Sequence, residues 1–162
     1  MRVSFDIDDT IVRNAVSHKD ERAKVWVRWL FRERLRPGTL ELFRALRARG
    51  CDIWLYTTSH RSAWYLQSWF WSLGVPLDGV VNQTRHDSAV ARLGPSKWPP
   101  AFGIDVHVDD LLVAEPSSIA GRFELVVIEP ADTAWSQKVL AAVDALLQAS
   151  PAMHPTPQSR RG

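Results

Sequence analysis

Residues 2 to 11 read RVSFDIDDTI, a short apolar strand that runs directly into acidic residues. Side chains two positions apart on an extended strand point to the same side, so Asp6 and Asp8 are expected to converge at its carboxyl end. Open parallel sheets bind their ligands at that edge. A pair of carboxylates there suits either metal binding or a nucleophile that works beside a proton donor.

A second stretch, residues 106 to 110, reads VHVDD and repeats this design. If the two strands are neighbours, four carboxylates crowd one edge of the sheet, and like charges at that distance require a cation. Carboxylate oxygens are hard ligands and the sequence has no Cys/His cluster, so Mg²⁺ is the expected ion. The four acids are Asp6, Asp8, Asp109 and Asp110.

The rest of the sequence alternates short apolar runs with longer amphipathic ones, which predicts an α/β fold. We expect a central parallel five-stranded sheet with helices on both faces. The strands are expected at residues 2–7, 53–56, 79–82, 106–108 and 125–128, and each of the last four follows a helical pattern. Clear helices are expected near residues 37–50, 60–73 and 134–148. His107, flanked by valines in the fourth strand, is expected to be a core residue whose hydrogen bonds are satisfied.

A chain of 162 residues fits one domain with a single core. We expect this domain to span residues 1–149, with at most one short helix between 12 and 36. Residues 150–162 contain three prolines and are expected to form a flexible tail. Cys51 is the only cysteine and no apolar run approaches a membrane span, so the expectation is a cytoplasmic protein without membrane contacts.

Two further groups could hold an anion. The second strand is followed by Thr57, Thr58 and Ser59, whose hydroxyls and backbone N–H groups at a helix start favour phosphate. Lys97, between the third and fourth strands, offers a flexible positive charge. Each feature also has an ordinary explanation, as a helix cap or a solvated lysine. Their combination with the paired acids is what indicates a phosphate site.

Taken together, these features resemble the four signature motifs of the haloacid dehalogenase superfamily. The motifs are D-x-D-x-T after an apolar strand, a threonine after the second strand, an intervening lysine, and an apolar strand that ends in DD. Their order and context match over residues 1 to about 130. The resemblance implies a Rossmannoid fold and phosphate-ester hydrolysis, because relatives that cleave carbon–halogen bonds, and the ion-pumping ATPases, lack an acid at the position of Asp8.

The resemblance also implies roles for the acids. Asp6 would attack phosphorus to give an aspartyl-phosphate. Asp8 would protonate the leaving oxygen and then activate the water that hydrolyses the intermediate. Mg²⁺ would be held by the carboxylates of Asp6 and Asp109 together with the backbone carbonyl of Asp8.

The remaining motif residues would support this chemistry. Thr57 or Thr58 would bind the transferring phosphoryl group together with Lys97. The tandem threonines leave the choice between the two open, although Thr57 lies at the usual distance from the strand. Thr10 would brace the loop, and Asp110 would support either the metal or Lys97.

In this superfamily, substrate choice usually resides in inserted cap domains. Residues 12–36 have room for a minimal cap only, so the site is expected to be open. The phosphorylated substrate could then be a small molecule, a phosphoprotein or a nucleic-acid end. The apolar run VWVRWLF at residues 25–31 could pack on the sheet, carry the leaving group or form a homodimer face.

Two alternatives from other classes stay open. A non-catalytic, receiver-like phosphoryl-binding module also joins acids, Mg²⁺, a threonine and a lysine, but it carries its phosphorylated aspartate after a mid-chain strand. A nucleic-acid-binding protein could use residues 13–50, which are rich in tryptophan and carry eleven Lys/Arg against four Asp/Glu. Persistent acyl phosphate without turnover would indicate the first, and salt-sensitive oligonucleotide binding the second.

Overall fold

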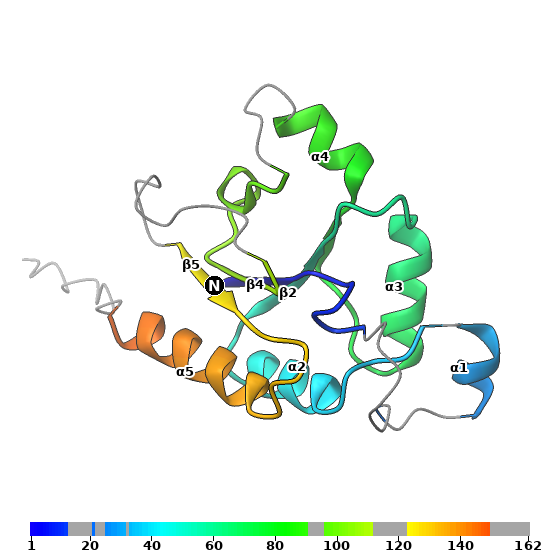
Figure 1. The fold of residues 1–162 in the computed structure, drawn as a ribbon, viewed down its shortest axis with the longest axis horizontal. Helices are drawn as coiled ribbons and strands as arrows, with labels where there is room; N and C mark the ends of the chain where they lie inside the picture. The colour runs from blue at the N-terminus through cyan, green and yellow to red at the C-terminus, as the bar shows by residue number, and fades with distance from the viewer. Residues whose placement is uncertain (13–20, 22–24, 32, 91–95, 112–122, 150–162) are drawn as a thin grey trace, which may run out of the picture.

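The computed structural model describes residues 1–12, 21, 25–31, 33–90, 96–111 and 123–149 (Figure 1). All five strands are parallel and form one sheet in the order β3-β2-β1-β4-β5, so β1 is central and pairs with β4. The predicted five-stranded parallel sheet is therefore confirmed. The strands are β1 (Arg2–Phe5), β2 (Asp52–Tyr56), β3 (Gly79–Val81), β4 (Val106–Asp109) and β5 (Glu124–Val127).

The first strand is shorter than the sequence pattern predicts. It ends at Phe5, not at residue 7, because the chain turns at once. The carbonyl of Ile7 accepts hydrogen bonds from the N–H groups of Ile11 (3.2 Å) and Val12 (2.7 Å), and Asp9 adopts a positive φ of 58°. The acidic segment after β1 is therefore a tight turn and not a continuation of the strand.

The helices follow the predicted pattern with one shifted start. Gly38 precedes α2 with a φ of 88°, and Gly50 follows it with a φ of 72°, as is typical of a glycine beyond a helix C-terminus. The helix expected from residue 60 begins at Ala63, because the Ser62 side chain caps it by accepting from the N–H of Tyr65. The helices are α1 (Val25–Leu30), α2 (Thr39–Ala48), α3 (Ala63–Ser72), α4 (Gln83–Val90) and α5 (Trp135–Gln148), with a 3₁₀ helix, η2 (Pro99–Phe102).

Side-chain alternation along the strands gives the sheet two different faces. We call one the apolar face: α2, α3 and α5 pack against it. We call the other the polar face: it lies under α4 and η2, and Figure 1 shows α4 on the opposite side of the sheet from α2 and α5. The apolar face carries Val3, Phe5, Ile53, Leu55, Val106 and Val108, and the polar face carries Ser4, Trp54, Tyr56 and His107.

The apolar run at residues 25–31 divides between core and surface. Phe31 is buried against Tyr65 and Trp69 of α3, with ring centroids 5.4 and 6.3 Å apart. Trp26 and Trp29 are exposed, so the run does not pack as a whole against the sheet. In Figure 1, α1 lies beside α3 at the margin of the molecule.

Several predictions concern segments that are not described. They are the helix before β5, the flexible tail and most of the possible cap, and they fall within residues 112–122, 150–162, 13–20 and 22–24. No helix in the described segments combines the length and the apolar character that a membrane crossing requires.

Candidate active site

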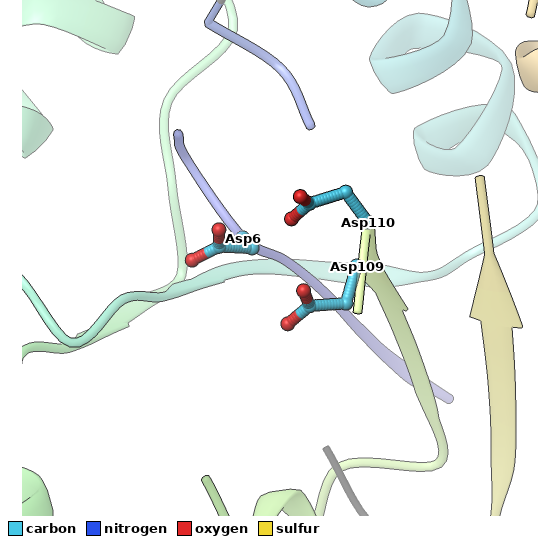
Figure 2. A group of neighbouring side chains, drawn as sticks. All are labelled: Asp6, Asp109 and Asp110. Atoms are coloured by element: carbon cyan, nitrogen blue, oxygen red, sulfur yellow. The ribbon is translucent and has the colours of Figure 1, made fainter. Parts of the chain in front are cut away.

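Three acids meet where β1 and β4 end. Pairing of Phe5 with Val108 aligns the two strands, and the N–H of Asp6 donates to the Val108 carbonyl at 2.9 Å. One carboxylate oxygen from each of Asp6, Asp109 and Asp110 lies within 4.8 Å of the other two. Figure 2 shows the three carboxylates pointing to the same side of these strand ends. The predicted meeting of acids from two strands is therefore confirmed for this acidic trio.

Lys97 completes the centre of the site. Its Nζ lies 2.7 Å from Oδ1 of Asp6 and 2.6 Å from Oδ2 of Asp109, and its side chain is only 6% exposed. The N–H of the next residue, Trp98, donates to Oη of Tyr56 at 2.8 Å and fixes this segment over the polar face. The lysine predicted from the motif thus reaches both acids.

Burial and neighbouring charges shift the pKa values of the acidic trio. Burial raises the pKa of Asp6 to about 6, although the ammonium of Lys97 opposes the shift. Burial also raises the pKa of Asp109, but the hydrogen bond from His107 and the charge of Lys97 outweigh it and lower the pKa to about 2. Burial, and then the Asp109 charge, raise the pKa of Asp110. When all three acids are ionised, one ammonium neutralises only one of the three charges.

The donor set therefore fits a hard divalent cation. Three carboxylates can each offer an oxygen to one point, and the excess negative charge would be relieved by such an ion. Mg²⁺ and Ca²⁺ both prefer oxygen ligands of this kind. The carboxylates of Asp6 and Asp109 are the two that the sequence motifs assigned to the metal, and Asp110 joins them.

His107 orients one of these acids. Its Nε2 lies 3.0 Å from Oδ2 of Asp109, and its Nδ1 lies 2.7 Å from Oγ of Ser4. Burial lowers the pKa of His107, so the ring is neutral. Because a carboxylate only accepts, Nε2 carries the proton and Nδ1 accepts from the Ser4 hydroxyl. His107 is the core residue that the sequence predicts, and it also positions Asp109, which the sequence reasoning missed.

Asp8 departs from its predicted placement. Its carboxylate is not part of the acidic trio, and its two oxygens each lie 2.8 Å from a terminal nitrogen of Arg61. The expected side-by-side arrangement of Asp6 and Asp8 is wrong, because it assumed an extended strand where the chain turns after Phe5. The side chain of Asp8 is 39% exposed and thus open to solvent.

Arg61 belongs to a network that the sequence reasoning missed. Its Nε lies 3.2 Å from Oε1 of Glu33, and the hydroxyl of Tyr65 donates to the other oxygen of Glu33. Nδ2 of Asn82 donates to the backbone carbonyl of Arg61 at 3.2 Å. The only local signal is the place of Arg61 in the sequence, two residues after the cluster Thr57-Thr58-Ser59 that follows β2.

The tandem threonines lie in different environments. Thr57 is buried, its N–H donates to the carbonyl of Val81 at 2.9 Å, and its hydroxyl accepts from the N–H of Ser59 at 3.1 Å. Thr58 is exposed. The expectation that this cluster starts a helix is wrong, because α3 begins only at Ala63. Any phosphate contact here would come from the loop and not from a helix terminus.

Thr10 is buried beneath the turn after β1. Among the described residues, its hydroxyl has no hydrogen-bond partner. Its carbonyl accepts from Nη1 of Arg36 at 3.3 Å, and Nη2 of Arg36 donates to the carbonyl of Glu129 at 2.9 Å. The guanidinium also lies 4.9 Å from the ring of Trp135. Arg36 therefore ties the turn to the segment after β5, and the bracing role expected of the Thr10 side chain stays a prediction.

The basic stretch of residues 13–50 uses several of its arginines internally. Arg36 is buried as described, Arg47 pairs with Asp78 at 2.5 Å, and Arg49 pairs with Asp144 at 2.7 Å. These guanidinium groups are engaged within the domain. Nucleic-acid binding by this stretch stays a prediction that the contacts do not favour.

The sequence matches no model of a known protein family and no curated protein. The relation to the haloacid dehalogenase superfamily therefore rests on the order of its motifs and stays a prediction.

Proposed function

We propose that the protein is a Mg²⁺-dependent phosphatase of the haloacid dehalogenase type, which hydrolyses a phosphate monoester through phosphorylated Asp6. The observation that carries this proposal is the position of Lys97, whose Nζ lies 2.7 Å from Asp6 and 2.6 Å from Asp109. The motif assigned these three residues to one site although they are far apart in the sequence, and their contact supports that assignment.

Asp6 is suited to act as the nucleophile. With a pKa of about 6 it is ionised at neutral pH, and Lys97 holds one of its oxygens in place. Mg²⁺, held by Asp6, Asp109 and Asp110 with the backbone carbonyl of Asp8, would supply positive charge beside the phosphoryl oxygens. Lys97 adds its own charge, and His107 keeps Asp109 oriented.

Asp8 is suited to proton transfer, because its carboxylate lies outside the acidic trio and is partly exposed. In the first step an Asp6 oxygen bonds to phosphorus, the ester P–O bond breaks, and Asp8 gives its proton to the leaving oxygen. In the second step water attacks phosphorus, Asp8 takes a proton from that water, and the bond to Asp6 breaks. The products are an alcohol and inorganic phosphate.

The test is hydrolysis of an aryl phosphate by the purified chain, with Mg²⁺ or with a chelator. We expect turnover only with Mg²⁺, and loss of about 10³-fold or more in Asp6→Asn because the nucleophile is removed. Asp87→Asn, on the exposed surface of α4, is the matched control and should retain full activity. Metal-independent turnover, or a fully active Asp6→Asn protein, would refute the proposal. A phosphorylated protein without turnover would indicate a phosphoryl-binding module instead.

A further inference from the structure

We propose that Arg61 is a positioning residue for Asp8, and that Glu33 and Tyr65 hold Arg61 in turn. This inference rests on the proposed phosphatase function, in which Asp8 moves the protons. It adds to that function a residue outside the four motifs.

The contact between Arg61 and Asp8 is bidentate. The Oδ2 and Oδ1 atoms of Asp8 each lie 2.8 Å from Nη1 and Nη2 of Arg61, respectively. Two parallel N–H···O bonds fix the plane of a carboxylate as well as its position. A lysine offers a single point charge on a flexible stem and could not fix that plane.

Arg61 is itself held from two directions that do not involve Asp8. Its Nε faces Glu33 at 3.2 Å, and Glu33 is engaged on its other oxygen by the hydroxyl of Tyr65. Its backbone carbonyl accepts from Asn82 at 3.2 Å. Glu33, which follows α1, therefore holds the guanidinium, and Asn82, which follows β3, holds the backbone of Arg61. The two terminal nitrogens face Asp8.

Stability alone does not account for this network. The side chains of Arg61 and Asp8 are 25% and 39% exposed, and ion pairs with that much solvent contact contribute little to folding. Asp8, in contrast, lies in a turn and touches none of the acidic trio, so its side chain would otherwise adopt several rotamers. Proton transfer requires the carboxylate within hydrogen-bond reach of the reacting oxygen.

Both oxygens of Asp8 accept hydrogen bonds from Arg61, so the carboxylate is held in one orientation. The proposed second step requires this carboxylate to face the attacking water. In that step, the water oxygen bonds to phosphorus, the bond to Asp6 breaks, and Asp8 receives the proton. If Arg61 is removed, we expect the second step to slow more than the first when the leaving group is a good one, because a nitrophenolate departs without proton donation.

The experiment compares the wild type with Arg61→Met and Arg61→Lys on two substrates, 4-nitrophenyl phosphate and an alkyl phosphate, with Mg²⁺. For Arg61→Met we expect kcat on the alkyl ester to fall about 10- to 100-fold, which is less than the loss expected when a general acid/base is removed altogether. The fall in kcat on the nitrophenyl ester should be smaller. With the nitrophenyl ester, acid-quenched Arg61→Met should contain more phosphorylated protein than the wild type. Arg61→Lys should recover only a small part of the activity.

The double variant Asp8→Asn/Arg61→Met separates positioning from a structural role. If Arg61 acts through Asp8, its removal has no further effect on kcat once Asp8 is replaced. Arg49→Met is the matched control, because Arg49 makes a similar two-point contact with Asp144 at 2.7 and 3.0 Å between α2 and α5. It should leave both substrates and the phosphoprotein level unchanged.

Wild-type kinetics in Arg61→Met would overturn the inference. So would a loss of kcat that is equal on both esters and that appears again when Arg61→Met is added to Asp8→Asn. If Arg61→Met does not fold, Glu33→Gln takes its place and should show the same pattern with a smaller loss. A wild type without Mg²⁺-dependent turnover and without phosphoprotein overturns the proposed function, and this inference with it. An active wild type beside an unaffected Arg61→Met overturns this inference alone.

Discussion

The two faces of the central sheet are built from alternate residues of the same strands, yet they bury different groups: the apolar face buries a large hydrophobic cluster, and the polar face buries a smaller one together with polar and charged side chains. Beneath the apolar face, Phe43 of α2 lies 4.8 Å from the ring of Phe5 and 5.5 Å from the ring of Phe70. On the polar face, Ser4 and His107 occupy the intervening positions and are fully buried. One layer of this small domain therefore provides most of the hydrophobic burial, while the other holds the candidate site.

Buried polar groups are costly unless they are paired, and several of those on the polar face are paired in series. Ser4 contacts His107, His107 contacts Asp109, and Lys97 joins Asp109 to Asp6. The series ends at the carboxyl edge of the sheet, where the acidic trio lies. Changes on the apolar face should therefore alter stability, and changes along this series should alter metal binding and turnover.

Removal of a core ring from the apolar face should change stability more than any other substitution considered below. Phe43→Ala should lower the free energy of unfolding by about 3–5 kcal/mol, because it removes a fully buried ring between two aromatic neighbours. Urea denaturation measures the loss. The folded fraction should keep a kcat within about twofold of the wild type if the site depends on the polar face. A selective loss of kcat would contradict the separation of the two faces.

The next prediction concerns how Asp6 makes stability depend on pH when no metal is bound. Its pKa rises from 3.8 to about 6 on folding, so the folded state binds this proton more tightly than the unfolded chain. The resulting stability is present below pH 3.8 and is lost as pH rises through about 6. At about 1.4 kcal/mol per pKa unit, the loss is on the order of 3 kcal/mol.

Denaturation in a chelator between pH 4 and 7 tests this prediction. Asp6→Asn should lack that part of the pH dependence while losing activity, so it should be at least as stable as the wild type at pH 7. Saturating Mg²⁺ should restore the stability of the wild type, because it binds the ionised acids. Identical pH profiles for the two proteins would show that Asp6 is not the perturbed group.

Replacement of His107 tests the series of polar contacts and should have a smaller effect. His107→Phe removes the Nε2 donor that contacts Asp109, and it leaves the Ser4 hydroxyl without its partner. We expect affinity for Mg²⁺ to fall about 10- to 100-fold, as is usual when a group that orients a metal ligand is lost. Isothermal titration with Mg²⁺ measures it. Unchanged affinity would mean that His107 serves packing alone.

The smallest change in stability is expected for Trp29, which lies on neither face of the sheet. Trp29 is 84% exposed, so Trp29→Ser should change the free energy of unfolding by less than about 0.5 kcal/mol. Light scattering on the same two proteins tests the predicted homodimer through residues 25–31. A dimeric wild type that becomes monomeric in Trp29→Ser supports that interface, and a wild type that is monomeric at all concentrations excludes it.

Much of the fold could be predicted because strongly periodic segments determine it. The strand alternation and the helical stripes predicted five parallel strands, and the acids at the ends of the first and fourth strands predicted where three carboxylates meet. Lys97 could be assigned only by its place in the motif order, because its Pro-rich surroundings carry no helical pattern.

The unpredicted parts depend on contacts between distant segments. Arg61 and Asp8 are 53 residues apart, and nothing local in either stretch indicates their pairing. The turn after Phe5 could not be read from apolar spacing, which continues through Ile7. His107 was expected in the core, but its contact with Asp109 depends on both residues pointing to the polar face at the end of β4.

Identification of the residue that becomes phosphorylated tests the proposed role of Asp6 as the nucleophile. The protein would be mixed with an aryl phosphate and Mg²⁺, quenched in acid, reduced with borohydride and sequenced by tandem mass spectrometry. We expect modification at Asp6 alone, present only with Mg²⁺ and absent in Asp6→Asn. Modification of another residue, or turnover that proceeds without any modified Asp6, would contradict that role.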